Sequence, residues 1–479
     1  LLLILVTSLF NRCTDHVDYE AIEGYQITSE IYFQQEADYD AALVGTYDVL
    51  QWLFFNIQLG AIASEITLCG GESATDYIGI QQIDDMTHYP ENNVLRQIWQ
   101  FLYEGVNRAN YMEENKANID FEGKEAMYGE VYFLRAYYYF ELVKFFGDVP
   151  LFTEARLTAG QAGTLTRTPK DEVYAQIELD LQNAIASLPN SQSQVGRVNK
   201  YTAYALLGKV LLYQDKFAEA ASALDNVIGV YSLVSDYGSQ FLRFGENGPE
   251  SVFEIQYSNQ SNWYDWGCAH CSEGNYAIIM NGPRGWSGPE YAQGWSFNVP
   301  TEEFYNSFEE GDSRRDATVL DIEAFAAATG ASYTEGYDHT GYFNNKYIPR
   351  AGESGGQTEL NYLTNFRIIR YSDVLLMAAE AYNRGGIDDG LAQEFLNQVR
   401  RRAFGGDDND ISASGSALTD AIWEERKFEL SLEGHRFFDL VRTGRASSLI
   451  AGFVEGKHEV FPIPQQEVDI SGLTQNAGY

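Results

Sequence analysis

Residues 201–229 carry the clearest periodic pattern of apolar and polar positions in the chain. The segment reads "YTAYALLGKVLLYQDKFAEAASALDNVIG", and its apolar positions recur with the spacing of two antiparallel helices joined at "QDK". The small residues Gly208 and Ala220 would let the two helices approach, while larger side chains fill the space between neighbouring helical pairs. Their order matches a tetratricopeptide repeat.

One such pair cannot bury its own apolar face, so the chain should contain others. Residues 171–190 show the second-helix pattern, and residues 124–146 are apolar on nearly every face, as in a centrally buried helix. A further pair is predicted from "RIIRYSDVLLMAAEAYNRGG" and "GLAQEFLNQVRRRAF". Amphipathic helices are also predicted at residues 38–59 and 92–116. The fold class is therefore mainly α, built from tetratricopeptide-like helical pairs.

The pattern changes between about residues 235 and 365, where glycine, serine, asparagine and aromatic residues accumulate and strand-like runs such as "SVFEIQY" occur. A structureless loop of this length is uncommon inside a compact domain. We predict a single domain over residues 14–479. Its helical scaffold, at about 36–234 and 366–445, cradles an irregular, loop-rich lobe with short strands at about 235–365.

The apolar run "LLLILVTSLF" at the start of the chain is too short to cross a bilayer and is typical of an export signal. The chain turns polar and acidic after Cys13, as in a bacterial lipoprotein signal, where the cysteine becomes the lipidated first residue. Arg12 stands where such signals have a small residue, so ordinary cleavage nearby is the alternative. We predict a signal peptide over residues 1–13 with lipidation at Cys13.

The charge balance restricts the partners. With 69 acidic and 32 basic side chains the formal net charge is −37, a mean field that repels polyphosphates. We therefore expect no nucleic-acid partner.

Two cysteines, Cys268 and Cys271, flank a histidine in "SNWYDWGCAHC" at residues 261–271. Two thiols and one imidazole fall short of the four ligands of a structural zinc site. We favour a disulfide, either local or involving Cys69, or buried thiols; a metal site and redox chemistry are the alternatives.

Four of the seven tryptophans lie within 33 residues of the lobe, flanked by Gly, Ser, Asn and Asp. They either fill a second small core or form exposed platforms for a ligand. A pyranose ring suits such platforms, because its C–H face stacks on an aromatic ring and its hydroxyls need donors and acceptors. The predicted ligand-binding residues are Trp263, Tyr264, Trp266, Trp286, Trp295, Asp76, Tyr77 and Tyr89.

The acidic residues do not predict catalysis. Glu425 and Glu429 are four residues apart on one predicted helix and alternate with basic residues, as on ion-paired helix faces. The acidic loop "GGDDNDIS" at 405–412 lacks the EF-hand spacing. We predict no metal site and no cofactor, with calcium in this loop as the alternative. Arg314 and Arg315 are a candidate site for an anionic ligand.

Three segments together resemble the SusD family of Bacteroidetes surface glycan-binding lipoproteins. They are "FLRAYYYFELVKFFGDVPL", "IIRYSDVLLMAAEAYNRGG" with "LNQVRRRA", and "AIWEERKFELSLEGHRFFDLVRTG" leading to "FPIPQQEVD". The resemblance implies helical pairs that cradle a ligand-binding lobe, and anchoring at Cys13 on the outer face of the outer membrane. It also implies a partner, a TonB-dependent SusC-like barrel, and capture of an oligosaccharide for import without catalysis.

Two other classes of function remain open at this point. One is a glycoside hydrolase or lyase on a helical frame, and the other is a repeat scaffold that binds protein or peptide.

Overall fold

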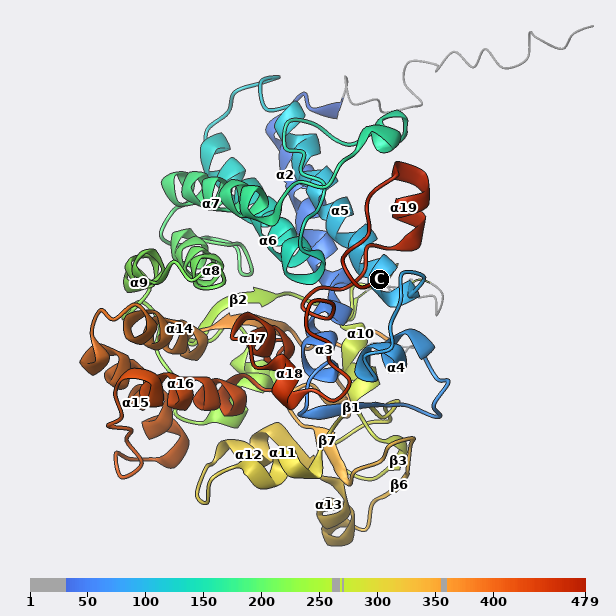
Figure 1. The fold of residues 1–479 in the computed structure, drawn as a ribbon, viewed down its shortest axis with the longest axis vertical. Helices are drawn as coiled ribbons and strands as arrows, with labels where there is room; N and C mark the ends of the chain where they lie inside the picture. The colour runs from blue at the N-terminus through green and yellow to red at the C-terminus, as the bar shows by residue number, and fades with distance from the viewer. Residues whose placement is uncertain (1–31, 261–267, 269–270, 355–359) are drawn as a thin grey trace, which may run out of the picture.

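The computed structural model describes residues 32–260, 268, 271–354 and 360–479. Helices dominate this part of the chain and pack in pairs along the left side of the molecule (Figure 1). The paired helices are α5 (Asn93–Glu114), α6 (Lys124–Phe146), α7 (Lys170–Ser187), α8 (Lys200–Leu212), α9 (Phe217–Asp225), α14 (Tyr371–Arg384) and α15 (Asp389–Phe404).

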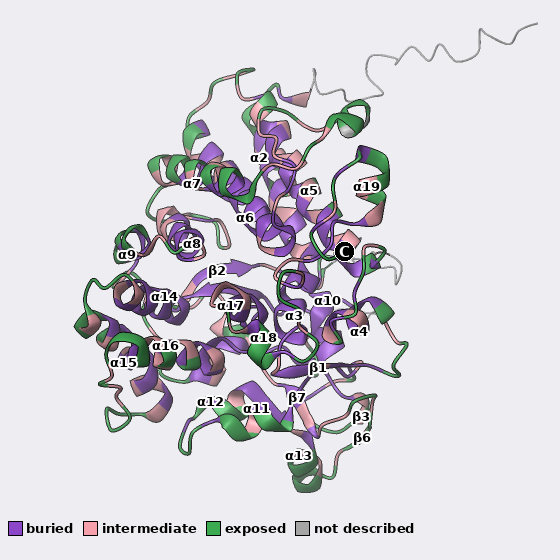
Figure 2. Cartoon of the chain, viewed as in Figure 1, coloured by how far each residue is buried: buried purple, intermediate pink, exposed green. Residues whose placement is uncertain are grey.

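Helix α6 lies at the centre of the upper helices, as its apolar sequence predicts (Figure 2). Its polar groups are satisfied internally: the Tyr138 hydroxyl donates to the Thr46 carbonyl at 2.6 Å, and Arg135 pairs with Asp180 at 2.7 Å. Burial is therefore not opposed by unpaired polar groups. The helix ends at Gly147, whose φ of +71° a side chain would disfavour.

The pair α8 and α9 confirms the tetratricopeptide-like prediction. A Cβ atom on Gly208 would come within 2.5 Å of the Leu224 side chain, so the close approach of the helices requires glycine there. Ala220 is fully buried at the same contact. The turn between the helices places Asp215 at a φ of +56°.

Two sequence predictions need correction. Residues 38–59 form two helices, α2 (Glu36–Asp48) and α3 (Phe54–Ile62), separated by a 3₁₀ turn at Val49–Trp52. Helix α3 is buried on every face, so amphipathic periodicity does not describe it. The run "RIIR" is not helical: it forms strand β8 (Phe366–Arg370), which pairs antiparallel with β2 (Ser251–Ile255) and so joins the lobe to the scaffold.

The lobe is folded around short antiparallel pairs. Within the lobe, β3 (Arg284–Ser287) pairs with β6 (Ser332–Thr334), and β5 (Val319–Asp321) pairs with β7 (Tyr342–Asn344). Another lobe strand, β4 (Phe297–Pro300), pairs with β1 (Thr67–Gly70), which comes from the part of the chain predicted as scaffold. The short helices are α10 (Tyr276–Asn281), α11 (Glu302–Ser307), α12 (Arg314–Thr318) and α13 (Ile322–Thr329). The predicted fold class, mainly α with helical pairs and an irregular lobe, is confirmed.

The C-terminal helices carry charges deep into the protein. These helices are α16 (Gly415–Leu430), α17 (Arg436–Arg442), α18 (Ala446–Leu449) and α19 (Gln465–Ser471). Glu429 is fully buried and lies 2.8 Å from Arg370 and 2.5 Å from Arg402. Arg426 is buried between Asp373 and Asp439 at 2.8 and 2.9 Å. We call these two groups together the buried ion-pair network. The first group is centred on Glu429 and also contains Arg314, Lys346, Arg370, Arg400, Arg402, Glu425 and Glu433. The second is centred on Arg426 and also contains Lys209, Asp373 and Asp439.

The pairs in this network join different elements rather than neighbours on one helix. The prediction that Glu425 and Glu429 form ion pairs is therefore confirmed. The prediction that these pairs lie along one helix face is wrong, because both carboxylates pair in the interior with arginines that are distant in sequence.

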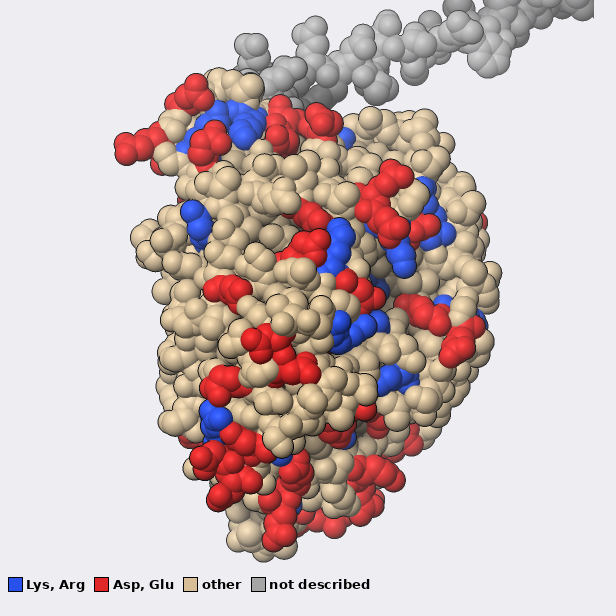
Figure 3. All heavy atoms as spheres, turned by 60° about the vertical axis from the view of Figure 1, so that its left-hand side comes forward, with Lys and Arg blue, Asp and Glu red and all other residues tan. Residues whose placement is uncertain are grey.

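The surface charge is uneven. Acidic side chains gather at the lower end of the face seen in Figure 3, at the height of α11–α13 in Figure 1. Exposed acidic residues of this end include Glu302, Glu303, Glu310, Asp316 and Glu323. In the part of the chain that the structure describes, no helix combines the length and apolar character that a bilayer crossing requires.

Candidate functional site

Four of the predicted residues lie outside the described residues: Cys13, Trp263, Tyr264 and Trp266. Of the remaining five, the structure brings Asp76, Tyr77 and Trp295 together. Trp286 and Tyr89 lie in other surroundings.

Trp295 is half-buried and packs against a row of aromatic rings that leads into the core. The Tyr276 ring lies edge-on to it at 5.5 Å between centroids, and Phe54, at the start of α3, lies 4.8 Å beyond. Because Tyr276 and Phe54 are buried, the position of the Trp295 ring is fixed by the core.

Tyr77 ends a second row that begins at the neighbouring residue of α3. The rings of Phe54 and Phe55 are 4.2 Å apart, and Phe55 lies edge-on to Tyr77 at 5.3 Å. Phe297, in β4, lies 6.3 Å from Tyr77 on its other side. Trp295 and Tyr77 are therefore half-exposed ends of one continuous chain of aromatic rings.

A charged pair stands beside these rings. The Arg284 guanidinium donates to the Asp76 carboxylate at 2.9 Å, and the backbone N–H of Glu72 donates to the same oxygen at 2.8 Å. Both side chains keep part of their surface open, 24% for Arg284 and 30% for Asp76. They can therefore offer further hydrogen bonds to a ligand. We call Asp76, Tyr77, Tyr276, Arg284, Trp295 and Phe297 the aromatic surface.

The backbone around the aromatic surface adopts unusual conformations. Tyr77, Ser296 and Asn298 have φ values of 51°, 60° and 54°. Non-glycine residues seldom adopt this region, and such positions concentrate at functional sites. Gly71 is required as well, because a Cβ atom there would lie 2.7 Å from the Phe297 ring.

Burial keeps the Tyr276 hydroxyl neutral. It raises the pKa of Tyr276 to about 12, with a smaller contribution from the Asp76 carboxylate nearby. Burial likewise raises the pKa of Tyr77. Both tyrosines keep their protons at physiological pH.

Trp286 belongs to a separate cluster. Its ring contacts Tyr291 at 5.9 Å and Phe325 at 6.0 Å, and it covers a small satellite core of the lobe. The alternative that some of these tryptophans fill a second small core therefore applies to Trp286. Tyr89 is 46% exposed and lies in the turn before α5, beyond the far end of α4 (Ile78–Asp84).

Sequence reasoning missed Tyr276, Arg284 and Phe297. Arg284 stands in "NGPRGW", beside Trp286, and its charge next to an aromatic was the available signal. Tyr276 and Phe297 carry no local signal, because their role depends on contacts with α3 and Tyr77.

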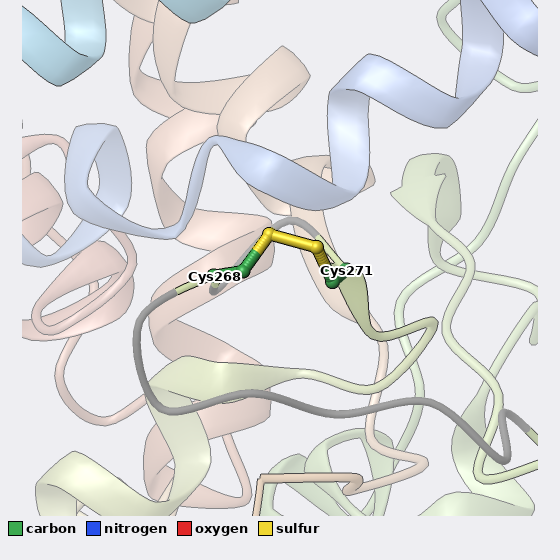
Figure 4. Close-up of a disulfide and its surroundings, with 2 residues drawn as sticks. All are labelled: Cys268 and Cys271. Atoms are coloured by element: carbon green, nitrogen blue, oxygen red, sulfur yellow. A yellow bond between two sulfur atoms is a disulfide. The ribbon is translucent and has the colours of Figure 1, made fainter.

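The two lobe cysteines form a disulfide, Cys268–Cys271, which closes a short loop (Figure 4). Cys69 is a buried free thiol in β1. The prediction of a local disulfide is thus confirmed, and a pairing with Cys69 is not formed. Among the described residues, no group of three or more His, Cys, Asp or Glu side chains is arranged to hold a metal ion.

The charged candidates are committed to internal pairs. Burial alone would raise the pKa of Glu429, but Arg402, Arg370 and Arg314 lower it well below its usual value. A buried, paired carboxylate of this kind is not available to a substrate. Arg314 is fully buried in the same network, so the two arginines do not form a joint anion site. Arg315 is 44% exposed and pairs with Asp316 at 2.9 Å. In the acidic loop, Asp410 pairs with Arg401 at 2.6 Å. The prediction of no cofactor, with calcium in this loop as the alternative, stays a prediction.

Comparison with known proteins places these features in a family. The sequence pattern described as the SusD family matches residues 249–452, and a pattern described as starch-binding and associating with the outer membrane matches residues 64–212. A SusD-like protein, P2, of Formosa agariphila is 29% identical over 95% of this chain and 94% of its own length.

Solved structures of known proteins match the fold of this chain over nearly its full length. A laminarin-binding SusD-like protein is 36% identical with a TM-score of 0.85, covering 93% of this chain and 100% of that one. Surface glycan-binding protein A from Bacteroides thetaiotaomicron, in complex with laminarihexaose, is 29% identical with a TM-score of 0.83, covering 92% and 99%. These relatives are described as binding proteins, in agreement with the prediction that the chain is not an enzyme. The chain belongs to the SusD family.

Proposed function

We propose that this protein binds a neutral oligosaccharide of the laminarin type at the aromatic surface. The observation that carries the proposal is the continuous chain of rings that holds Trp295 and Tyr77 half-exposed beside the Asp76–Arg284 pair. Stacking faces with adjacent donors and acceptors match the apolar face and hydroxyl rim of a pyranose. The names of two relatives, one laminarin-binding and one in complex with laminarihexaose, support this class of glycan.

The expected affinity is modest. Covering half of one aromatic ring contributes roughly 2 to 3 kcal/mol, less than the ~4 kcal/mol or more that association costs. Two rings and the hydrogen bonds of Asp76 and Arg284 together exceed that cost. The net gain of a few kcal/mol corresponds to binding at about the millimolar level, which suits a protein that captures a glycan and then releases it.

The cellular role extends this proposal. The captured oligosaccharide would pass to a TonB-dependent SusC-like barrel for import, with the protein held on the outer face of the outer membrane through lipid on Cys13. Family membership supports this role, and the matching pattern is described as associating with the outer membrane.

Calorimetric titration with laminarihexaose tests the binding site. Trp295→Ala removes one exposed ring and should weaken binding about tenfold to thirtyfold, the equivalent of roughly 2 kcal/mol. Trp423→Ala is the matched control: this half-buried tryptophan lies between Arg384 and Arg445, away from the aromatic surface. It should leave the dissociation constant unchanged.

Thermal unfolding of both variants separates binding from stability. If Trp295→Ala binds laminarihexaose like the unaltered protein, or if Trp423→Ala weakens binding equally, the aromatic surface is not the binding site.

A further inference from the structure

A cavity of about 560 Å³ lies away from the aromatic surface, between helix α2, the loop before α8 and strand β2. Neither Tyr77 nor Trp295 lines it. Its volume falls in the range of small-molecule sites, about 300 to 1,000 Å³. A second hollow of about 280 Å³ lies alongside and shares the segment 194–197 with it. The surface is therefore hollowed over more than one sugar ring.

The cavity combines apolar side chains with amides. Val44 and Val195, on opposite walls, are 52% and 74% exposed. Gln51, Gln194 and Gln256 contribute side-chain amides to the same walls. The Gln256 amide is engaged by Asn247 and Asn365, and the Gln194 oxygen accepts from Arg197 at 3.1 Å. The Gln51 oxygen and the Gln194 NH₂ group are therefore the amide groups that this lining offers a saccharide beside its apolar face.

One of these amides is incompletely satisfied. The Gln51 side chain donates to the Gln256 carbonyl at 2.9 Å, but its buried Oε1 has no hydrogen-bond partner among the described residues. A buried polar atom without a partner is uncommon in a folded protein and calls for an explanation, such as a ligand or a water molecule.

Three of the four charged residues that line the cavity have ion-pair partners, whereas the exposed Glu273 carboxylate forms no ion pair among the described residues. Asp48 pairs with Arg108 at 2.9 Å, and Arg197 pairs with Asp40 at 2.9 Å. Glu254 lies 3.7 Å from Arg367. A ligand would therefore meet paired charges and one unpaired carboxylate, which disfavours an anion and is compatible with a neutral molecule.

The cavity is also coupled to the aromatic surface through the chain. Gln51 lies three residues before Phe54, which supports Trp295, and its carbonyl accepts a hydrogen bond from the Tyr257 hydroxyl at 3.2 Å. Residues 51–55 thus line the cavity at one end and pack against the rings of the aromatic surface at the other.

We propose that this cavity is a second saccharide subsite, which binds a neutral pyranose unit independently of the aromatic surface. The class of ligand in this proposal, a glycan, rests on the proposed function. The location of the subsite rests on the cavity alone. A second subsite would let one protein hold a long glycan at two points and raise its effective affinity.

The test is a titration of laminarihexaose into the double variant Val44→Asp/Val195→Asp. The two substitutions place two negative charges on the apolar walls of the cavity. Because both valines are exposed, the fold should tolerate the change; Val195→Asp alone, at the more exposed position, is the milder variant. Val454→Asp, at an equally exposed valine (52%) outside the cavity, is the control. We expect the double variant to lose one of two binding events, or at least tenfold in affinity, while the control retains both.

The same titration in Trp295→Ala distinguishes the two proposals. Binding that Trp295→Ala weakens but does not abolish, and that disappears on adding the two aspartates, establishes the cavity as a second site beside the aromatic surface. Binding that is lost in Trp295→Ala but unchanged by the aspartates overturns the second subsite and leaves the aromatic surface standing. Binding unchanged by Trp295→Ala but lost with the aspartates overturns the aromatic surface and supports the cavity. No binding by the unaltered protein overturns both.

Discussion

The buried ion-pair network and the aromatic surface reverse the usual distribution of side chains. In the network, Arg370 and Glu429 are almost completely buried, although charged residues normally stay in water. At the aromatic surface, Trp295 and Tyr77 remain half-exposed, although large aromatic side chains normally contribute to the core.

The difference lies in how completely each group is satisfied inside the protein. Glu429 receives Arg370, Arg402 and Arg314, so its capacity for partners is used internally. Trp295 packs edge-on against Tyr276 and keeps part of its surface open. The comparison teaches that dense charge in this chain marks architecture, while aromatic side chains that rest on the core and keep part of their surface open mark the place for a ligand.

The strongest way to break this comparison is to remove a charge from the network. Glu429→Ala should lower the free energy of unfolding by about 3 to 5 kcal/mol, because it leaves buried arginines without their partner. Chemical denaturation measures the loss. Laminarihexaose binding by the folded fraction should persist.

Glu424→Ala provides the matched control for that change. Glu424 pairs with Lys427 on the surface, with its own side chain 50% exposed, so its removal should cost at most about 1 kcal/mol. Equal effects of the two substitutions would mean that the buried pairs do not support the fold.

Acid should weaken the network before it affects the aromatic surface. Burial lowers the pKa of His435 to about 3, with Lys209 acting in the same direction and Asp373 against it. The unfolded chain then binds a proton that the folded protein does not, so stability falls as pH drops below about 6.5. His435→Asn should reduce this slope by up to ~1.4 kcal/mol per pH unit in denaturation curves at pH 7, 6 and 5.

A carboxylate next to the network acts at lower pH: Glu380 pairs with Arg442, which also pairs with Asp439 of the network. Burial opposes ionisation of Glu380, but Arg442 lowers its pKa to about 2. Its contribution is complete above about pH 4.5 and is lost as pH falls towards 2. His435→Asn should leave that acid limb unchanged; a variant with an unaltered slope between pH 6.5 and 5 would contradict the assignment to His435.

A smaller effect is expected from the charged pair of the aromatic surface. Asp76→Asn should weaken laminarihexaose binding about tenfold, because a hydrogen bond to a charged group contributes roughly 1.5 kcal/mol. Stability should change little, since the Asp76–Arg284 pair is partly exposed. Calorimetry and thermal unfolding measure the two quantities.

Asp316→Asn is the control, at an acidic residue that is 75% exposed and paired with Arg315. If both substitutions weaken binding alike, the effect comes from net charge and not from the position of Asp76.

The sequence predicted the scaffold well because its signals are local. Apolar periodicity located α6 and the pair α8–α9, and the small residue Gly208 marked a helix contact that the structure confirms. The strand β8 was missed because "RIIR" precedes a helix directly and pairs with β2, more than a hundred residues earlier.

The candidate site was predicted only in part, because its geometry is non-local. Asp76, Tyr77 and Trp295 were identified from composition, but their meeting depends on Phe54 and Phe55 and on the pairing of β1 with β4. Trp286 has the same flanking residues as Trp295 and nevertheless covers a satellite core. Local sequence does not distinguish the two tryptophans; the neighbours that the fold supplies do.

A crystal structure of the protein with laminarihexaose tests the central claim most directly. We predict a glucose ring stacked on Trp295 or Tyr77, with hydroxyl groups hydrogen-bonded to Asp76 or Arg284. A laminarihexaose molecule bound without contact to either ring would contradict the claim that the half-exposed aromatic residues form the glycan-binding surface.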